Sequence, residues 1–209
     1  MKKRNTIILS LPVVCIFLYI ALYIFSASLY PGGSSINIHS EGFDWINNYW
    51  CNLTDQTAVN GMDNPARPLA IAAMIILCIG LGIFFYLFSE SRSKNIYWKH
   101  IIKYGGIMAM ACTILVFTDL HNIMIGIASV FGLVALIGVF VVLIQNRSIS
   151  LLGLGFLCML LLAANNYVYY SGMFLTALPL LQKVSTGVFL LWILLINRDL
   201  YASTLIDEV

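Results

Sequence analysis

The sequence predicts an all-α protein, a polytopic bundle of six transmembrane helices with one long structured loop on its outer side between the first two spans. Hydrophobic residues make up 61% of the 209 residues and charged residues only 10%, whereas a soluble domain carries about 25% charged residues. The mean hydropathy is +0.93, so the chain must use lipid as its solvent. Because the spans are long and most connections are short, we expect residues 1–209 to form a single bundle domain.

Six apolar stretches come close to the roughly 20 residues that a helix needs to cross a bilayer. They lie at about 6–28, 68–89, 102–119, 123–144, 150–171 and 176–197. The first follows Lys2, Lys3 and Arg4, as in a signal peptide, but its apolar stretch is longer than the usual 7–15 residues of such a segment. We therefore expect it to remain as a span, and cleavage after Ser26-Ala27-Ser28 is the alternative.

Polar residues mark the connections between the later spans. Asp63-Asn64-Pro65 precedes the second span, and a charged segment from Arg92 to Lys103 leads into the third. Asp119 to Asn122 is the turn between the third and fourth spans. Arg147 joins the fourth to the fifth, and Ser171 to Ala177 joins the fifth to the sixth. Because these connections separate six spans, which is an even number, both termini are expected on the same side of the membrane.

The basic residues predict which side that is. Cytoplasmic loops carry an excess of Lys and Arg. With six spans, all but two of the 11 basic residues fall on the side of the termini. The exceptions are Arg67, at the outer end of the second span, and Lys183, within the sixth. Both termini are therefore predicted to be cytoplasmic.

The outer loop, at about 29–67, is long among very short outer connections, and such loops are usually functional or disordered. Its Pro31-Gly32-Gly33 is a turn signal. Aromatic residues between Phe43 and Trp50 argue against disorder, and Tyr and Trp prefer the membrane interface. We predict a short interfacial helix over 43–54 and an ordered lid over the bundle.

Polar groups inside a membrane are costly and mark candidate functional positions. Here they gather near the outer ends of the spans and in the long loop. Asn165 and Tyr169 are four residues apart, so they share one face of the fifth helix. The predicted lining of an outward-facing polar pocket comprises Asp44, Asn48, Asn64, Arg67, Asn165, Asn166, Tyr169 and Lys183.

Two of these assignments have structural alternatives. Lys183 would be expensive facing lipid, so it should meet a carboxylate of Asp44, Asp63 or Asp119. Alternatively, its long side chain snorkels to the outer interface. The asparagines of the fifth span would line a ligand site or form the hydrogen bonds that join helices in many membrane bundles.

Asp119 and His121 are the most enzyme-like pair, because a carboxylate and an imidazole serve as base and orienting group, or as metal ligands. A helix end with a capping Asp119 and an interfacial His121 is nevertheless the preferred interpretation. His39, His121 and Asp119 are the candidates for an outer metal site, but they have no diagnostic zinc spacing. We therefore assign no metal and no cofactor. The 5 cysteines show no CxxC or disulfide pattern.

One segment of the outer loop carries a likeness to known proteins. The run FDWINNYWCNLTD, Phe43–Asp55, is followed by Asn64-Pro65 at the start of the second span. With six spans, this layout resembles the DUF-nine-nine-eight family of bacterial and archaeal membrane proteins, which is functionally uncharacterised, and more distantly the Frag/DRAM/Sfk-type six-span proteins. The resemblance implies a cell-membrane location but supplies no catalytic residue. The ceramidase and adiponectin-receptor hydrolases use more histidines and seven spans.

The sequence favours a multi-pass membrane protein that binds a lipid headgroup or small amphiphile in the outer pocket, with membrane lipid as its partner. The alternative is a membrane-embedded hydrolase or transferase that uses Asp119 and His121, with or without a metal. A structural or assembly role is the third reading. A net charge of +2 with no basic patch argues against nucleic-acid binding.

Overall fold

The structure, a computed structural model, describes residues 2–118 and 120–206. Its helices are α1 (Lys2–Ser28), α2 (Arg67–Arg92), α3 (Ile96–Ile114), α4 (His121–Gln145), α5 (Ile149–Ser171) and α6 (Leu178–Ile206). Three short 3-10 helices, η1 (Trp50–Leu53), η2 (Leu115–Phe117) and η3 (Leu175–Ala177), lie in the connections. The described residues contain six helices long and apolar enough to span a membrane. The predicted all-α, multi-pass fold is thus confirmed.

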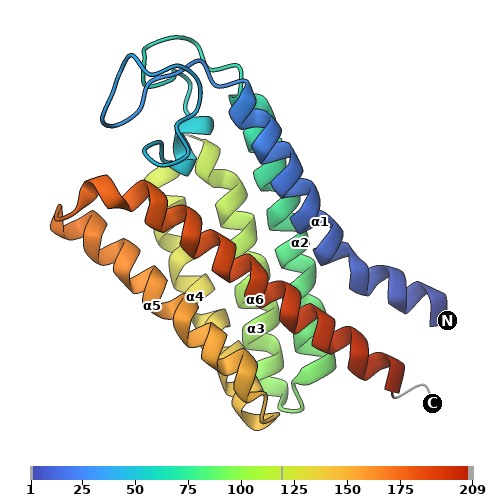
Figure 1. Cartoon of the computed structure of the whole chain (residues 1–209). Coiled ribbons are helices and arrows are strands. Elements are labelled where there is room, and N and C mark those ends of the chain that lie inside the picture. The colour runs from blue at the N-terminus through green and yellow to red at the C-terminus, as the bar shows by residue number, and fades with distance from the viewer. Residues whose placement is uncertain (1, 119, 207–209) are drawn as a thin grey trace.

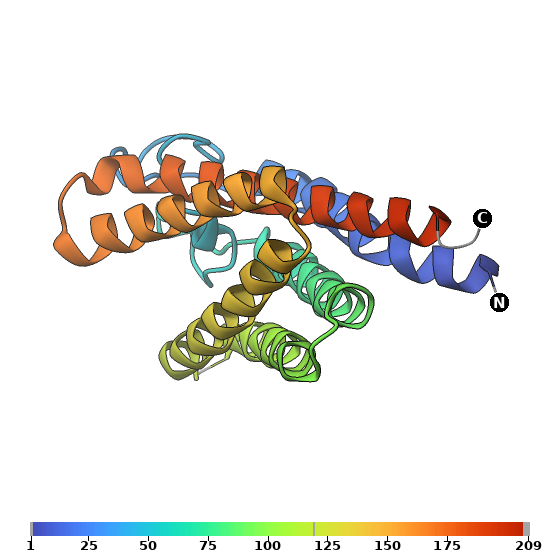
Figure 2. The same cartoon turned by 90° about the horizontal axis from the view of Figure 1, so that it is seen from below.

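The six helices run up and down, and both termini lie at the end of the bundle opposite the long loop (Figure 1). The view along the bundle shows the α5–α6 hairpin as one layer with α1 beside it, and α2, α3 and α4 on the other side (Figure 2). Near the α4–α5 turn, the ring of Phe140 in α4 lies 5.2 Å from that of Phe156 in α5 and 5.6 Å from that of Trp192 in α6. Aromatic packing therefore joins the two layers.

Small residues allow the helices to approach closely, which is how membrane helices associate when lipid removes the hydrophobic drive between them. A Cβ atom at Gly106 of α3 would lie 2.2 Å from Phe85 Cγ of α2. A Cβ at Gly80 would lie 2.4 Å from Cys15 Cβ of α1. These glycines thus set the spacing of α1, α2 and α3.

Two helices, α3 and α6, extend furthest beyond the predicted spans. The third was expected from residue 102, but α3 begins at Ile96, because Asn95 caps it by accepting a 2.8 Å hydrogen bond from the Tyr97 amide. Its first turns carry Lys99, which pairs with Glu90 at 2.6 Å, and such charged turns do not register as apolar. The sixth helix continues past residue 197, where Asp199 forms an ion pair with Arg92.

Polar contacts join α2, α4 and α6 at the end of the bundle where both termini lie. Arg92, at the end of α2, reaches Asp199 of α6 through both the carboxylate and the backbone carbonyl. Asn146, at the end of α4, donates to the Arg92 carbonyl at 3.3 Å. The ends of α2, α4 and α6 are therefore linked at this face.

We propose that this face is cytoplasmic, following the bias of the basic residues. A reporter fused after residue 209 is expected to read as cytoplasmic, and the same reporter inserted within 34–62 to read as external. Activity of paired cytoplasmic and external reporters in cells measures this. Readings from the two positions on the same side would contradict the topology.

Candidate functional site

The outer loop, residues 29–66, is held to the bundle by its own hydrogen bonds rather than by a long helix. The helix expected over 43–54 is wrong: a turn at Asp44–Asn48 is followed only by η1. Asp44 explains the turn, because its Oδ1 accepts from the Ile46 and Asn47 amides at 3.0 and 3.1 Å. Such side-chain to backbone bonds compete with helix formation.

Asn48 is the buried centre of the loop, with a relative exposure of 0%. Its Nδ2 donates to the Gly33 carbonyl at 2.8 Å and to Asn52 Oδ1 at 3.3 Å. Its Oδ1 accepts from the Asp44 amide at 2.8 Å. The side chain that was predicted to bind a ligand is therefore engaged within the loop itself.

Asn64 connects the loop to α2 in a similar way. Its Nδ2 donates to the carbonyls of Asn52 at 2.9 Å and Asp55 at 3.0 Å, and its Oδ1 accepts from the Ala66 amide at 3.2 Å. On the other side, Tyr23 of α1 donates to the Trp50 carbonyl at 2.9 Å. The loop is thus ordered and docked on both helices.

Lys183 of α6 points up into the underside of this loop. Its Nζ donates to the Asn48 carbonyl at 2.5 Å and to the Pro179 carbonyl at 3.1 Å. It also lies 5.6 Å from the centre of the Phe43 ring and 5.5 Å from that of Trp50, within the range of cation–π attraction. Lys183 thus holds the loop to α6. We call its contacts with Asn48, Phe43 and Trp50 the clamp.

The carboxylate partner expected for Lys183 is replaced by carbonyls and rings, since no ion pair within 4.0 Å joins Lys183 to a described carboxylate. The Asp44 carboxylate lies near enough to Lys183 for their opposite charges to attract each other. The pKa of Asp44 is lowered, chiefly by the hydrogen bond from the Asn47 side chain and to a smaller extent by Lys183. Asp44 is therefore held in its charged form beside the clamp.

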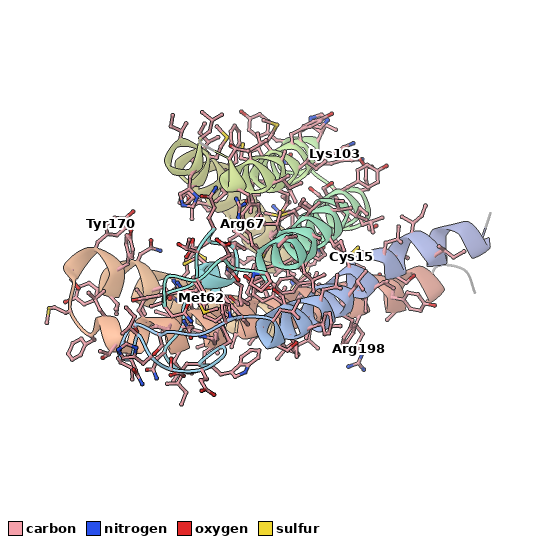
Figure 3. All side chains as sticks on the ribbon, turned by 90° about the horizontal axis from the view of Figure 1, so that it is seen from above. Cys15, Met62, Arg67, Lys103, Tyr170 and Arg198 are labelled. Atoms are coloured by element: carbon pink, nitrogen blue, oxygen red, sulfur yellow. The ribbon has the colours of Figure 1, made fainter. Side chains whose placement is uncertain are left out.

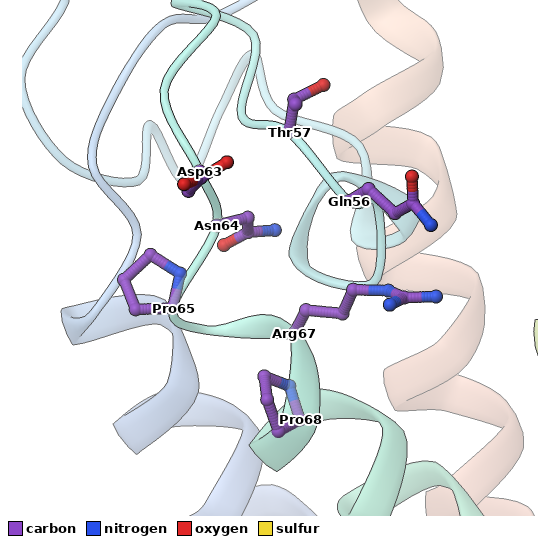
Figure 4. Close-up of a pocket in the computed structure, with 7 residues that line it drawn as sticks. All are labelled: Gln56, Thr57, Asp63, Asn64, Pro65, Arg67 and Pro68. Carbon is purple, nitrogen blue, oxygen red and sulfur yellow. The ribbon is translucent and has the colours of Figure 1, made fainter.

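A recess of about 660 Å³ opens where the loop meets the first turn of α2 (Figure 4), within the range of small-molecule sites. It is lined by Gln56, Thr57, Asp63, Asn64, Pro65, Arg67 and Pro68. Of the predicted pocket residues, the recess brings together Asn64 and Arg67. Sequence reasoning missed Gln56 and Thr57, which carry no signal beyond being polar loop residues.

Arg67 is the cation of this recess. Its Nε donates to the Thr54 carbonyl at 3.0 Å, which fixes the side chain in an extended position. Among the described residues it forms no ion pair, although Asp63 lines the same recess. From above, Arg67 lies near the middle of the molecule, whereas Tyr170 of α5 lies at its edge (Figure 3).

The α5 residues predicted for the pocket lie elsewhere. Asn165 donates to the Leu161 carbonyl at 2.9 Å and to Ser185 Oγ of α6, which is the helix-joining role left open by the sequence. Asn166 is exposed and donates to the Leu162 carbonyl at 2.9 Å. Tyr169 is 64% exposed. These residues do not line the recess at Arg67.

The pair proposed for catalysis is described only in part, because Asp119 lies outside the described residues. His121 is exposed, and its Nδ1 lies 2.8 Å from the Val116 carbonyl. His39 is exposed in the outer loop. Among the described residues, no group of three or more His, Cys, Asp or Glu side chains is arranged to hold a metal ion. The hydrolase reading therefore stays a prediction.

Comparison with known proteins leaves the chain without an assigned family. No family model matches it, and no match was found among the curated proteins or the solved structures. The resemblance to six-span families therefore stays a prediction.

The clamp predicts how the loop should respond to loss of Lys183. Lys183→Met removes a charged hydrogen bond, worth about 1.5–3 kcal/mol, and two cation–π contacts, worth about 0.5–2 kcal/mol each. We expect limited proteolysis of the detergent-purified variant to cut within 43–55 at least about tenfold faster than in the wild type.

Gln182→Met is the matched control, because it changes the neighbouring residue of α6 without touching the clamp. It should keep the wild-type rate of cutting. Rapid cutting throughout 43–55 in the wild type itself, with an unchanged melting temperature of the bundle, would show that the loop is not docked.

Proposed function

We propose that this multi-pass membrane protein binds the headgroup of a phosphate-bearing amphiphile in the recess at the outer end of α2. The observation that carries the proposal is Arg67, a fixed and only partly exposed guanidinium without an ion-pair partner among the described residues. Arginine binds phosphate oxygens through paired hydrogen bonds. A membrane interface offers lipid phosphates at this level.

The position of Arg67 at the start of a helix strengthens the case for an anion. α2 begins at Arg67, and the N-terminus of a helix carries a partial positive charge. Pro68 follows and has no amide hydrogen, so the guanidinium rather than the first amides of the helix would meet the phosphate. Arg67 and the helix dipole favour the same charge at the same end of the recess.

Asp63 favours a headgroup that carries a second, positive group. Figure 4 shows Asp63 and Arg67 on different sides of the recess. A phosphate at Arg67 and an ammonium at Asp63 would satisfy both side chains, as in a phosphoethanolamine headgroup. The acyl chains of such a ligand would then run down toward the apolar helices.

Thermal unfolding of the detergent-purified chain tests the proposal with three soluble probes. Dihexanoyl phosphatidylethanolamine carries headgroup and chains, phosphoethanolamine lacks the chains, and dihexanoylglycerol lacks the phosphate. The phospholipid is expected to raise the melting temperature, because a ligand that binds only the folded state stabilises it. The other two probes should give little or no shift at the same concentration.

Substitution of Arg67 should remove this effect. Arg67→Gln loses charge-assisted hydrogen bonds worth about 1.5–3 kcal/mol, so we expect the affinity for the phospholipid to fall roughly tenfold to hundredfold. Arg147→Gln, in the α4–α5 turn at the opposite end, is the matched control and should bind normally. Equal stabilisation of wild type and Arg67→Gln would overturn the proposal.

A further inference from the structure

A second recess lies at the opposite end of the molecule, in the groove between α1 and α6. Its volume is about 380 Å³. The groove is apolar over most of its length, and its lining includes Leu9, Val13 and Phe17 of α1 with Leu194, Asn197 and Arg198 of α6. It is separate from the outer recess and shares no lining residue with it.

One polar side chain of α6 bonds to the backbone of α1 beside this groove. Asn197 Nδ2 donates to the Leu9 carbonyl of α1 at 2.9 Å. Pro12 lies in the next turn of α1 and has no amide hydrogen, so the carbonyl four residues earlier, that of Ile8, has no helix donor. Asn197 therefore joins α6 to α1 where the first helix contains its proline.

This bond leaves the other atom of the amide without a partner. Asn197 is only 3% exposed, and its Oδ1 is buried with no hydrogen-bond partner among the described residues. An unsatisfied buried acceptor costs about 1–3 kcal/mol. The groove therefore holds an acceptor that a donor from a bound molecule would satisfy.

Arg198 supplies a cation to the same groove, because it follows Asn197 in α6 and lines the groove with it. Arg198 is exposed and forms no ion pair among the described residues, since its neighbour Asp199 is taken by Arg92. Figure 3 shows Arg198 projecting from the edge of the molecule. Tyr201, one turn further along α6, also lines the groove. Arg and Tyr at a helix end are typical of the membrane interface.

We propose that the groove binds one anionic phospholipid whose headgroup carries a hydroxyl, of the phosphatidylglycerol type, from the leaflet on the side of the termini. The acyl chain lies on Leu9, Val13 and Phe17, the phosphate meets Arg198, and the headgroup hydroxyl donates to Asn197 Oδ1. A phosphate alone would leave the acceptor unsatisfied, and an uncharged lipid would leave the cation unpaired. The combination selects both charge and hydroxyl.

Native mass spectrometry of the full chain tests this with lipids of matched acyl chains. Phosphatidylglycerol and phosphatidylmethanol carry the same charge, but only the first has headgroup hydroxyls. Phosphatidylcholine is the control for charge. The Arg67→Gln background is used throughout, so that binding at the outer recess does not contribute. We expect phosphatidylglycerol to be retained several-fold better than phosphatidylmethanol, and phosphatidylcholine to be retained least.

Two variants assign the preference to the groove. Arg198→Gln should lower the retention of both anionic lipids about tenfold, while Arg147→Gln, which removes an arginine from the α4–α5 turn at the same end, should not. Asn197→Leu should abolish the difference between phosphatidylglycerol and phosphatidylmethanol. If Asn197→Leu does not fold, the lipid series and Arg198→Gln still decide the matter. Equal retention of the three lipids, or no effect of Arg198→Gln, would mean that the groove holds bulk lipid or water only and would overturn the proposal.

Discussion

Replacing Gly106 with alanine is expected to destabilise the bundle by about 1–3 kcal/mol or more, the range for overpacking a close contact. The new Cβ would lie 2.2 Å from Phe85 Cγ and 2.6 Å from Phe85 Cβ. Because Phe85 Cβ is fixed to the backbone of α2, a rotation of the ring cannot relieve the clash, and α2 and α3 would have to separate. Thermal unfolding in one detergent, followed by circular dichroism, measures the effect.

Gly82→Ala in α2 is the matched control, because a Cβ there meets nothing within 4 Å. Alanine is favoured over glycine in a helix by about 0.8–1 kcal/mol, so the melting temperature of this variant should rise slightly. Opposite signs for the two Gly→Ala changes would separate close packing from helix propensity. A melting temperature of Gly106→Ala at or above that of the wild type would show that α2 and α3 are not packed as described.

The six spans could be predicted from the sequence because bilayer thickness requires a long apolar stretch for each helix, whatever its neighbours are. The start of α3 and the end of α6 could not be predicted, because charged turns extend these helices. In these turns Lys99 pairs with Glu90, and Asp199 pairs with Arg92. A hydropathy pattern counts such residues as boundaries. Their partners come from other helices and become visible only when the chain is folded.

The polar residues of the outer end show the same limit more sharply. That they gather near one level follows from the sequence, but their division into separate roles does not. Asn48 serves the loop, Asn165 joins α5 to α6, and Arg67 faces the recess. Each role depends on which carbonyl or hydroxyl lies within 3 Å or so of the side chain, and residue type and spacing do not contain that information.

The outer loop is docked on the bundle as predicted, but the helix predicted over 43–54 is wrong. The aromatic residues suggested a helix on the interface, but Asp44 and Asn48 each bond to backbone groups nearby and turn the chain instead. Asn and Asp favour such local bonds over a helix. The number of amides and carboxylates in the segment was therefore a better guide to its conformation than its aromatic pattern.

Asn48→Ala is expected to release the outer loop while the six helices remain folded. Two backbone groups, the buried Gly33 carbonyl and the part-buried Asp44 amide, lose their partner, at a cost of about 1–3 kcal/mol for the buried carbonyl. The carbonyl of Asn48 would also be displaced from Lys183 Nζ, so the clamp to α6 should weaken with it. Hydrogen exchange across residues 32–60 is expected to speed up at least about tenfold, with exchange in α2 and α3 unchanged.

Asn47→Ala is the matched control for this change. Its side chain is half-buried and makes one hydrogen bond, a 2.8 Å contact with the charged Asp44 Oδ2, worth about 1.5–3 kcal/mol. Its loss leaves no backbone group without a partner, so exchange should rise less than in Asn48→Ala. Because Asn64 joins the loop to α2, loosening of the loop should reach the recess, and Asn48→Ala should also bind the phospholipid probe more weakly. Unchanged exchange in Asn48→Ala would mean that its three hydrogen bonds do not hold the loop, and unchanged phospholipid binding would mean that the recess at Arg67 forms without it.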